Sequence, residues 1–127
     1  MKISMKMAQE VLKKNPIYRF SKGEVSKKRM KKIKQERKKY GFSFEECWNL
    51  NDTIASFVLP RLIMFRKRTD CCPSKITFEE WKDILDTMIE GFYLIVDKKS
   101  WELRDEELEK AKKGIELFSK YFFSLWD

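Results

Sequence analysis

One row of carboxylates is spaced four, three and four residues apart along the chain: Glu79, Asp83, Asp86 and Glu90. In a helix these side chains share one side, where they could hold a divalent metal ion or act as an acid–base pair. Carboxylate metal sites in helical bundles usually include histidine, and none of the 127 residues is histidine. We therefore interpret the row as a solvated helix face, and we expect no metal and no cofactor.

The absence of histidine also excludes several kinds of catalytic site. Ser–His and Cys–His pairs cannot be formed, and no side chain has an unperturbed pKa near neutrality. The three cysteines, Cys47, Cys71 and Cys72, have no C-x-x-C spacing, and we expect them to be reduced thiols. The sequence therefore predicts a protein that is not an enzyme and has no catalytic residues. A carboxylate-dependent enzyme is the alternative left open.

The charge is unevenly distributed along the chain. The net charge is +8, but residues 1–41 contain 15 Lys and Arg against 3 acids, whereas the rest contains 13 against 17. This difference divides the chain into a basic N-terminal arm, 1–41, and a body, 42–127. Within residues 27–39, nine of thirteen side chains are basic. Blocks of like charge are typical of segments that interact with a partner of opposite charge.

Nucleic-acid phosphates are the partner that such a block fits best. The basic stretch has no Asn, one Gln and a single aromatic residue at its end, so base-edge recognition and base stacking both lack obvious residues. Non-specific or shape-based binding is the most it indicates. A block of lysines that only solubilises a surface helix is the alternative. The candidate phosphate contacts are Lys27, Lys28, Arg29, Lys31, Lys32, Lys34, Lys38, Lys39, Arg61, Arg66, Lys67 and Arg68.

Helix signals are frequent along the arm. A short helix over 4–14 is expected to end before Pro16, and the Ser21-x-x-Glu24 capping box predicts a second helix starting near residue 22. In that helix, Met30, Ile33 and Tyr40 form a narrow apolar stripe that could pack on or beside the body.

In the body, the Ser43-x-x-Glu46 capping box predicts a short turn that carries Cys47 and Trp48 toward the core. The next helix, 50–68, is expected to bend at Pro60, which cannot donate a hydrogen bond to the carbonyl of Ser56. Its expected core face is Leu50, Ile54, Phe57, Val58, Leu62 and Phe65.

Two further helices follow. Thr77-x-x-Glu80 caps a helix with the expected core face Trp81, Ile84, Leu85, Met88, Phe92, Ile95 and Val96. The last helix, 104–126, is expected to bury Leu108, Ala111, Ile115, Phe118, Phe122 and Leu125. Gly114 within it predicts close approach of a neighbouring backbone. The remaining aromatic residues Tyr121, Phe123 and Trp126 either close the bundle or form a surface for a partner.

These signals predict an all-α fold, because only four glycines and three prolines are available for turns. We expect a compact bundle of about four main helices, one of them kinked at Pro60, with a lysine-rich helical arm. No apolar run is long enough to span a membrane, and the N-terminus lacks the apolar core of a signal peptide. A cytoplasmic location is therefore expected.

Three blocks of the body carry a family resemblance. They are 48–62 (W-N-L-N-D-T-I-A-S-F-V-L-P-R-L), 79–89 (E-E-W-K-D-I-L-D-T-M-I) and 114–126 (G-I-E-L-F-S-K-Y-F-F-S-L-W). Over residues 42–126 the chain resembles a widespread group of small bacteriophage and prophage proteins. The resemblance implies a phage or mobile-element origin and a helical body in the host cytoplasm, and it implies no activity. The basic arm lies outside the shared pattern.

Two functions are consistent with these features. The first is a small phage-encoded binding protein whose basic arm contacts nucleic acid or a ribonucleoprotein. The second is a phage inhibitor or modulator of a bacterial protein complex, such as an anti-CRISPR-like anti-defence protein or a polymerase-binding protein. The sequence does not indicate the oligomeric state.

Overall fold

The computed structural model describes residues 2–13, 26–98 and 102–126. Throughout these ranges the regular elements are helices and no strand is present, which confirms the predicted all-α class. The elements are α1 (Met5–Leu12), α2 (Lys27–Tyr40), η2 (Phe44–Cys47), α3 (Leu50–Arg68), α4 (Phe78–Asp97), α5 (Asp105–Lys120) and η4 (Phe122–Ser124), where η denotes a 3-10 turn. None of the helices in the described part of the chain has both the length and the apolar character needed to cross a bilayer.

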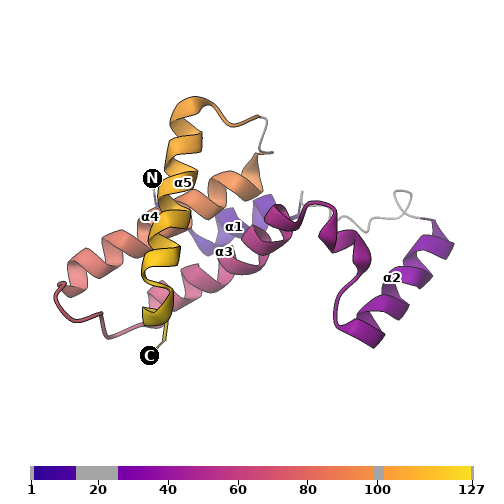
Figure 1. Cartoon of the computed structure of the whole chain (residues 1–127), viewed down its shortest axis with the longest axis horizontal. Coiled ribbons are helices and arrows are strands. Elements are labelled where there is room, and N and C mark those ends of the chain that lie inside the picture. Colours follow the sequence, from indigo (N-terminus) through magenta and orange to yellow (C-terminus); the bar gives the residue numbers. More distant parts are fainter. Residues whose placement is uncertain (1, 14–25, 99–101, 127) are drawn as a thin grey trace.

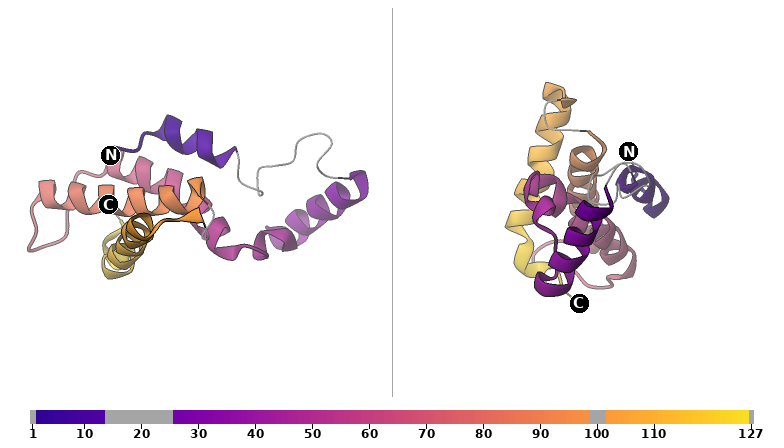
Figure 2. Two further views of the ribbon diagram at one scale, coloured as in Figure 1. Left: turned by 90° about the horizontal axis from the view of Figure 1, so that it is seen from above. Right: turned by 90° about the vertical axis from the view of Figure 1, so that its right-hand side faces the viewer.

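Four of the helices pack together and one stands apart. Helix α4 lies against both α3 and α5, and α1 lies against α3 and α4. Helix α2 extends away from this body, and its main contact is with the adjoining turn η2 (Figures 1 and 2). The segment that is basic in sequence is therefore divided in space, because α1 joins the core and α2 does not.

The start of each N-terminal helix is set by a serine. Ser4 caps α1, with its hydroxyl 3.2 Å from the amide nitrogen of Met7, and α1 buries Ala8 and Val11 in the core. Ser26 caps α2 in the same way, with its hydroxyl 3.1 Å from the amide nitrogen of Arg29. The capping box predicted at Ser21 and Glu24 lies outside the described residues.

The bounds predicted for α3 agree with the structure, but the predicted core face is only partly correct. Leu62 is buried and Val58 and Phe65 pack against the core, as predicted. Leu50, Ile54 and Phe57 are about half exposed, and the buried side chains are those of Ala55, Ser56, Leu59 and Leu62. The small residues Ala55 and Ser56 let α3 approach its neighbours closely, whereas Leu50, Ile54 and Phe57 lie on a side that no helix of the described residues covers. Pro60 lies inside α3.

Helix α4 is the centre of the core. Thr77 and Glu80 form the predicted capping box. The Thr77 hydroxyl lies 3.1 Å from the amide nitrogen of Glu80, and the Glu80 carboxylate lies 3.0 Å from the amide nitrogen of Thr77. Among the predicted core residues, Trp81, Leu85, Met88 and Phe92 are buried, and Ile84, Ile95 and Val96 are partly buried. Ile89 and Leu94 are also buried, although they were not part of the predicted core face.

Helices α4 and α5 cross where two glycines meet. A Cβ atom added to Gly91 would lie 2.9 Å from the Cα of Gly114, and one added to Gly114 would lie 2.9 Å from the Cα of Gly91. The close approach predicted from Gly114 is therefore confirmed. The predicted buried stripe of α5 is partly wrong: Ala111 is buried, but Ile115 and Phe122 are exposed, because this crossing turns the small residues toward α4. The helix also ends at Lys120, before the predicted limit of 126.

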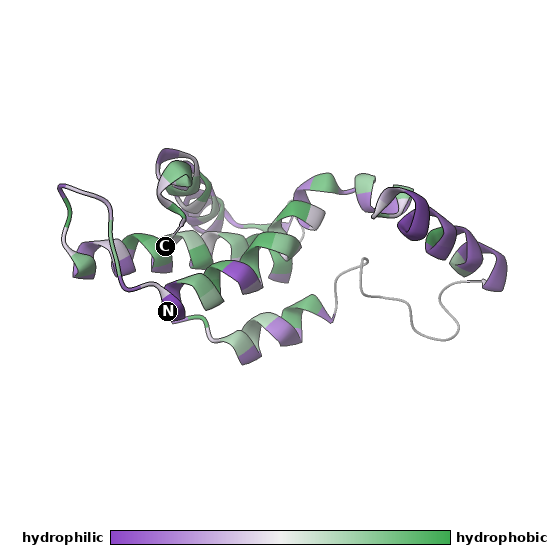
Figure 3. Cartoon of the chain, turned by 90° about the horizontal axis from the view of Figure 1, so that it is seen from below, coloured by the Kyte–Doolittle hydropathy of each residue, from purple (hydrophilic) through white to green (hydrophobic). Residues whose placement is uncertain are grey.

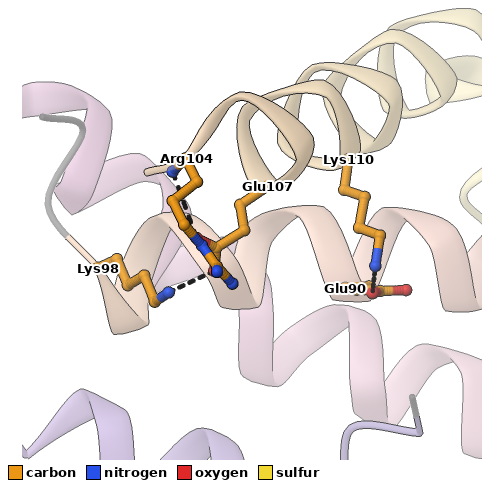
Figure 4. A network of polar contacts seen from close by, with 5 residues as sticks. All are labelled: Glu90, Lys98, Arg104, Glu107 and Lys110. Carbon is orange, nitrogen blue, oxygen red and sulfur yellow. Dashed lines mark hydrogen bonds and ion pairs between the residues drawn. The ribbon is translucent and has the colours of Figure 1, made fainter. Parts of the chain in front are cut away.

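Ion pairs reinforce the crossing on both sides (Figure 4). The Glu107 carboxylate at the start of α5 binds Lys98, which caps the end of α4, and lies 3.1 Å from the Nε of Arg104. Lys110 of α5 lies 3.6 Å from the carboxylate of Glu90 on α4. The hydrogen bonds from Lys98 and Arg104 lower the pKa of Glu107 from 4.5 to about 2.

We expect Gly114→Ala to destabilise the fold. Its Cβ would meet the backbone of α4 at 2.9 Å from Gly91 Cα and 3.0 Å from the carbonyl oxygen of Thr87. Overpacking should outweigh the gain of about 1 kcal/mol in helix propensity and leave a net loss of about 1–2 kcal/mol in unfolding free energy. Urea unfolding followed by circular dichroism measures this loss. Ser119→Ala, at an exposed position of α5, is the control, and equal stability of the two variants would contradict the steric role of the crossing.

We expect Glu107→Gln to lower stability in a pH-dependent way. Because folding lowers the pKa of Glu107, its carboxylate stabilises the folded state above its ordinary pKa of 4.5, and this contribution is lost as the pH falls toward about 2. The difference in unfolding midpoint between wild type and variant should therefore be largest near neutral pH and should shrink between about pH 5 and pH 2. Glu109→Gln removes an exposed carboxylate from the same helix and should change stability little at neutral pH. If the wild type were more stable than Glu107→Gln by the same amount at pH 2 as at pH 7, the ionised carboxylate could not be the source of the difference.

Candidate functional site

The basic block of the sequence forms one protruding helix, α2. Figure 3 shows that α2 is strongly hydrophilic and lies at the end of the molecule farthest from the body. All eight predicted phosphate contacts on this helix are exposed: Lys27, Lys28, Arg29, Lys31, Lys32, Lys34, Lys38 and Lys39. Ten of the fourteen side chains of α2 are exposed, so most of its circumference is open to a partner.

Turn η2 holds α2 in place through a small buried contact. Ile33 and Glu36 are the buried side chains of α2, and the Glu36 carboxylate lies 3.1 Å from the amide nitrogen of Phe44. Gly41, with φ of 86°, reverses the chain directly after the helix. The amide of Ser43 then donates a hydrogen bond to the carboxylate of Glu46. Met30, Ile33 and Tyr40, the predicted apolar stripe, are not part of the core of the four-helix body, and α2 contacts the adjoining turn η2.

Arg29 is used inside this unit. Its guanidinium forms an ion pair with Glu45, and this hydrogen bond raises the pKa of Arg29. The same group lies 5.6 Å from the ring centre of Trp48. Trp48 is 72% exposed and Cys47 is also exposed, so the prediction that this turn carries both toward the core is wrong. The reason is that η2 packs on α2, which itself lies outside the body.

The second group of predicted contacts lies elsewhere. Arg66 and Lys67 are at the end of α3, about 25 Å along the helix axis from its start beside η2. Arg66 is bound to Asp86 of α4, with its Nη2 3.1 Å from the carboxylate. Arg61 lies over the ring of Phe57, 3.7 Å from its centre. The structure therefore does not join Arg61, Arg66, Lys67 and Arg68 to the lysines of α2 in one continuous surface.

The row of carboxylates on α4 is partly used for packing. Asp86 pairs with Arg66 and Glu90 pairs with Lys110, each across a helix contact. In the ranges that the structure covers, no three acidic or thiol side chains come together as a metal site. Cys47, Cys71 and Cys72 are exposed and do not form disulfides.

The aromatic residues at the C-terminus are divided between core and surface. The ring of Tyr121 packs edge-on against buried Trp81, with 5.5 Å between centres. Phe123 and Trp126 are 87% and 72% exposed. Tyr121 therefore closes the bundle, whereas Phe123 and Trp126 are available to a partner.

One feature of the site, a cluster of three aromatic rings, was not predicted from the sequence. The rings of Tyr40, Phe42 and Phe44 gather where α2 turns into η2, with centres 5.3 to 6.4 Å apart. Only Tyr40 falls at the end of the basic block, so the other two were not associated with it. The spacing Y-x-F-x-F after the last lysine was the available signal, but it gives no indication that the chain folds back.

Comparison with protein families, with curated proteins and with solved structures found no match to this chain.

We expect Ile33→Ala to release α2 from η2 while the body stays folded. Ile33 is 1% exposed and is not part of the main core, so its loss should cost about 2–5 kcal/mol locally within the α2–η2 unit. Limited trypsin digestion should cleave α2 faster than in wild type, with no change in the urea midpoint of the body. Gln35→Ala, at the exposed neighbouring side of α2, is the control. Wild-type protease resistance in Ile33→Ala would contradict this anchoring role.

Proposed function

We propose that the protein binds nucleic acid, alone or within a nucleoprotein, and that the lysines of α2 contact the phosphates. One observation supports this proposal above all. Seven exposed lysines lie on a helix that projects from the body, and no acidic side chain of the described residues pairs with them: Lys27, Lys28, Lys31, Lys32, Lys34, Lys38 and Lys39. A helix that served only as a soluble surface would need far fewer cations of one sign.

Electrostatics supports the same interpretation. Pairs such as Lys27 and Lys31, or Lys28 and Lys32, are four residues apart, and like charges at this spacing destabilise a helix. A polyanion removes this repulsion. The fourteen residues of α2 extend about 21 Å, a length over which duplex DNA carries about twelve phosphates. About six phosphate contacts would give a slope near −5 for log affinity against log salt.

The proposal does not include reading of base sequence. Within α2 there is no Asn and one Gln, the side chains that recognise adenine edges, and Arg29 is paired with Glu45. From the resemblance of residues 42–126 to small phage proteins, we also propose that this is a phage or prophage protein that acts in the host cytoplasm.

We further propose that α3 bends at Pro60, since this residue has no N–H to donate to the carbonyl of Ser56. The bend would set the direction in which η2 and α2 leave the body.

A second candidate is binding to a bacterial protein complex as an inhibitor or modulator. The observation that favours it is the exposed side of α3, where Leu50, Ile54, Phe57 and Met64 recur at helical spacing. Apolar side chains at such spacing fit a partner helix or groove. Phe123 and Trp126 add exposed aromatic surface at the C-terminus.

We expect reversal of three charges on α2 to weaken nucleic-acid binding. The variant Lys28→Glu, Lys31→Glu, Lys32→Glu should lower the affinity for a 20-base-pair duplex and reduce the salt slope by about 3, because each lost phosphate contact removes about 0.9. Fluorescence anisotropy over a salt series measures both quantities. The matched control reverses three exposed lysines of α5, Lys112, Lys113 and Lys120, and thus makes the same change in net charge. Equal losses in the two variants would show that net charge, and not α2, determines binding.

Capture from bacterial lysate separates the two candidates. Retention that needs α2 and disappears after nuclease treatment supports nucleic acid. A nuclease-resistant protein partner that is lost with Ile54→Lys and Phe57→Ser, but kept after charge reversal on α2, supports the second candidate.

A further inference from the structure

Three aromatic rings form an exposed cluster at the end of the basic helix. Tyr40, the last residue of α2, is 49% exposed, Phe42 of the following loop is 42% exposed, and Phe44 of η2 is 48% exposed. The three rings are tilted against one another by 36° to 47°. They shield only part of each other, so ring surface remains in contact with water.

The backbone around these rings is fixed. Gly41 makes the turn between Tyr40 and Phe42, and the amide of Phe44 is bound to the buried carboxylate of Glu36. Ser43, between the two phenylalanines, is fully buried, and its amide is bound to Glu46. The rings therefore project from a held loop and need little ordering when a ligand arrives.

A row of cations leads to the cluster along α2. Lys28, Lys32 and Lys39 are four and seven residues apart, so they share one side of the helix over about 16 Å. The last of them, Lys39, has its ammonium nitrogen 5.2 Å from the ring centre of Tyr40. Exposed aromatic rings and phosphate-binding cations are thus direct neighbours.

Each of the three carboxylates of the α2–η2 unit near the cluster is bound by a donor, which reduces its repulsion of an anionic ligand. Glu36 is bound to the Phe44 amide, Glu45 to Arg29, and Glu46 to the Ser43 amide. Each of these carboxylates is thus held by a donor of the same α2–η2 unit. Residues 27–47 carry nine Lys and Arg against these three acids, so the unit is net positive.

We propose that Tyr40, Phe42 and Phe44 form a stacking platform for unpaired bases, and that the ligand of α2 is single-stranded nucleic acid. Proteins that bind single strands combine a basic track for the backbone with aromatic rings on which bases stack. In a duplex the base faces are already stacked on one another, so the rings add nothing to duplex binding. This inference rests on the proposed function and names its ligand class. A protein partner would also meet apolar rings, but the lysine row beside them favours a polyanion.

The test compares a ring variant with two kinds of oligonucleotide. Tyr40→Leu with Phe44→Leu keeps the apolar volume of both side chains and removes their aromatic faces. We expect the affinity for a 20-nucleotide oligo-dT or oligo-rU strand to fall about tenfold or more, while the affinity for a 20-base-pair duplex is unchanged. The tighter of the two single strands identifies the preferred sugar. Phe122→Leu with Phe123→Leu, two exposed and touching rings on the body, is the matched control and should change neither affinity.

The outcomes separate this inference from the function on which it rests. If the wild-type protein binds neither strand nor duplex, the proposed function and the platform both fail. If it binds both, and the ring variant retains wild-type affinity for the strands, the platform alone is overturned. Equal losses for strand and duplex would also overturn it, because the rings would then only support α2. A shift from dimer to monomer in sedimentation, with strand affinity unchanged, would assign the rings to contact between copies of the chain.

Discussion

The contact between Gly91 and Gly114 is the constraint from which the rest of the body follows. Without Cβ atoms the backbones of α4 and α5 approach until a methyl group at either position would lie 2.9 Å from the Cα of the other. At this distance the flanking side chains must meet in pairs. Phe92 packs edge-on against Phe118 with 5.1 Å between ring centres, and Trp81 against Tyr121 in the same way. Glu90 and Lys110 then fall within reach of each other outside the apolar contact.

The same crossing explains why the opposite side of α4 is available to α3 and α1. With α5 on one side, the side chains of Leu85, Met88 and Ile89 complete the core together with Leu59 and Leu62 of α3. Small residues recur here as they do at the glycines, since Ala8 of α1 and Ala55 of α3 are both buried. Because small side chains allow close packing, a body of only four helices buries the side chain of Trp81 completely.

One consequence of this packing is the separation of charge in space. The core is completed by α1, α3, α4 and α5, and α2 adds nothing to it. The basic helix is carried outward by η2, so its lysines face solvent and the aromatic residues of the turn stay exposed. A lysine-rich helix packed on the mildly acidic body would have had its charges partly neutralised. The fold instead displays them, and this arrangement underlies both the proposed function and its single-stranded ligand.

How far the sequence predicts this structure depends on the range of each interaction. The capping box at Thr77 and the limits of 50–68 were predicted correctly, because caps and helix periodicity act within a few residues. The core face of α3 was predicted only in part, since Leu62 is buried but Ile54 and Phe57 are exposed. Two stripes, one through Ile54 and Phe57 and one through Ala55 and Leu59, are both compatible with its periodicity. The larger residues were chosen, but the neighbouring helices cover the smaller ones.

By itself, therefore, the sequence determined that the chain is helical, where α3 begins and ends, where α4 begins, and that its positive charge is concentrated in one segment. Only the tertiary structure decided which side of α3 is buried, that α2 stands apart from α1, and that Phe42 and Phe44 join Tyr40 beside the lysines. Those features depend on contacts between residues that fold back through a turn or cross from another helix, and no local pattern specifies which surfaces will meet.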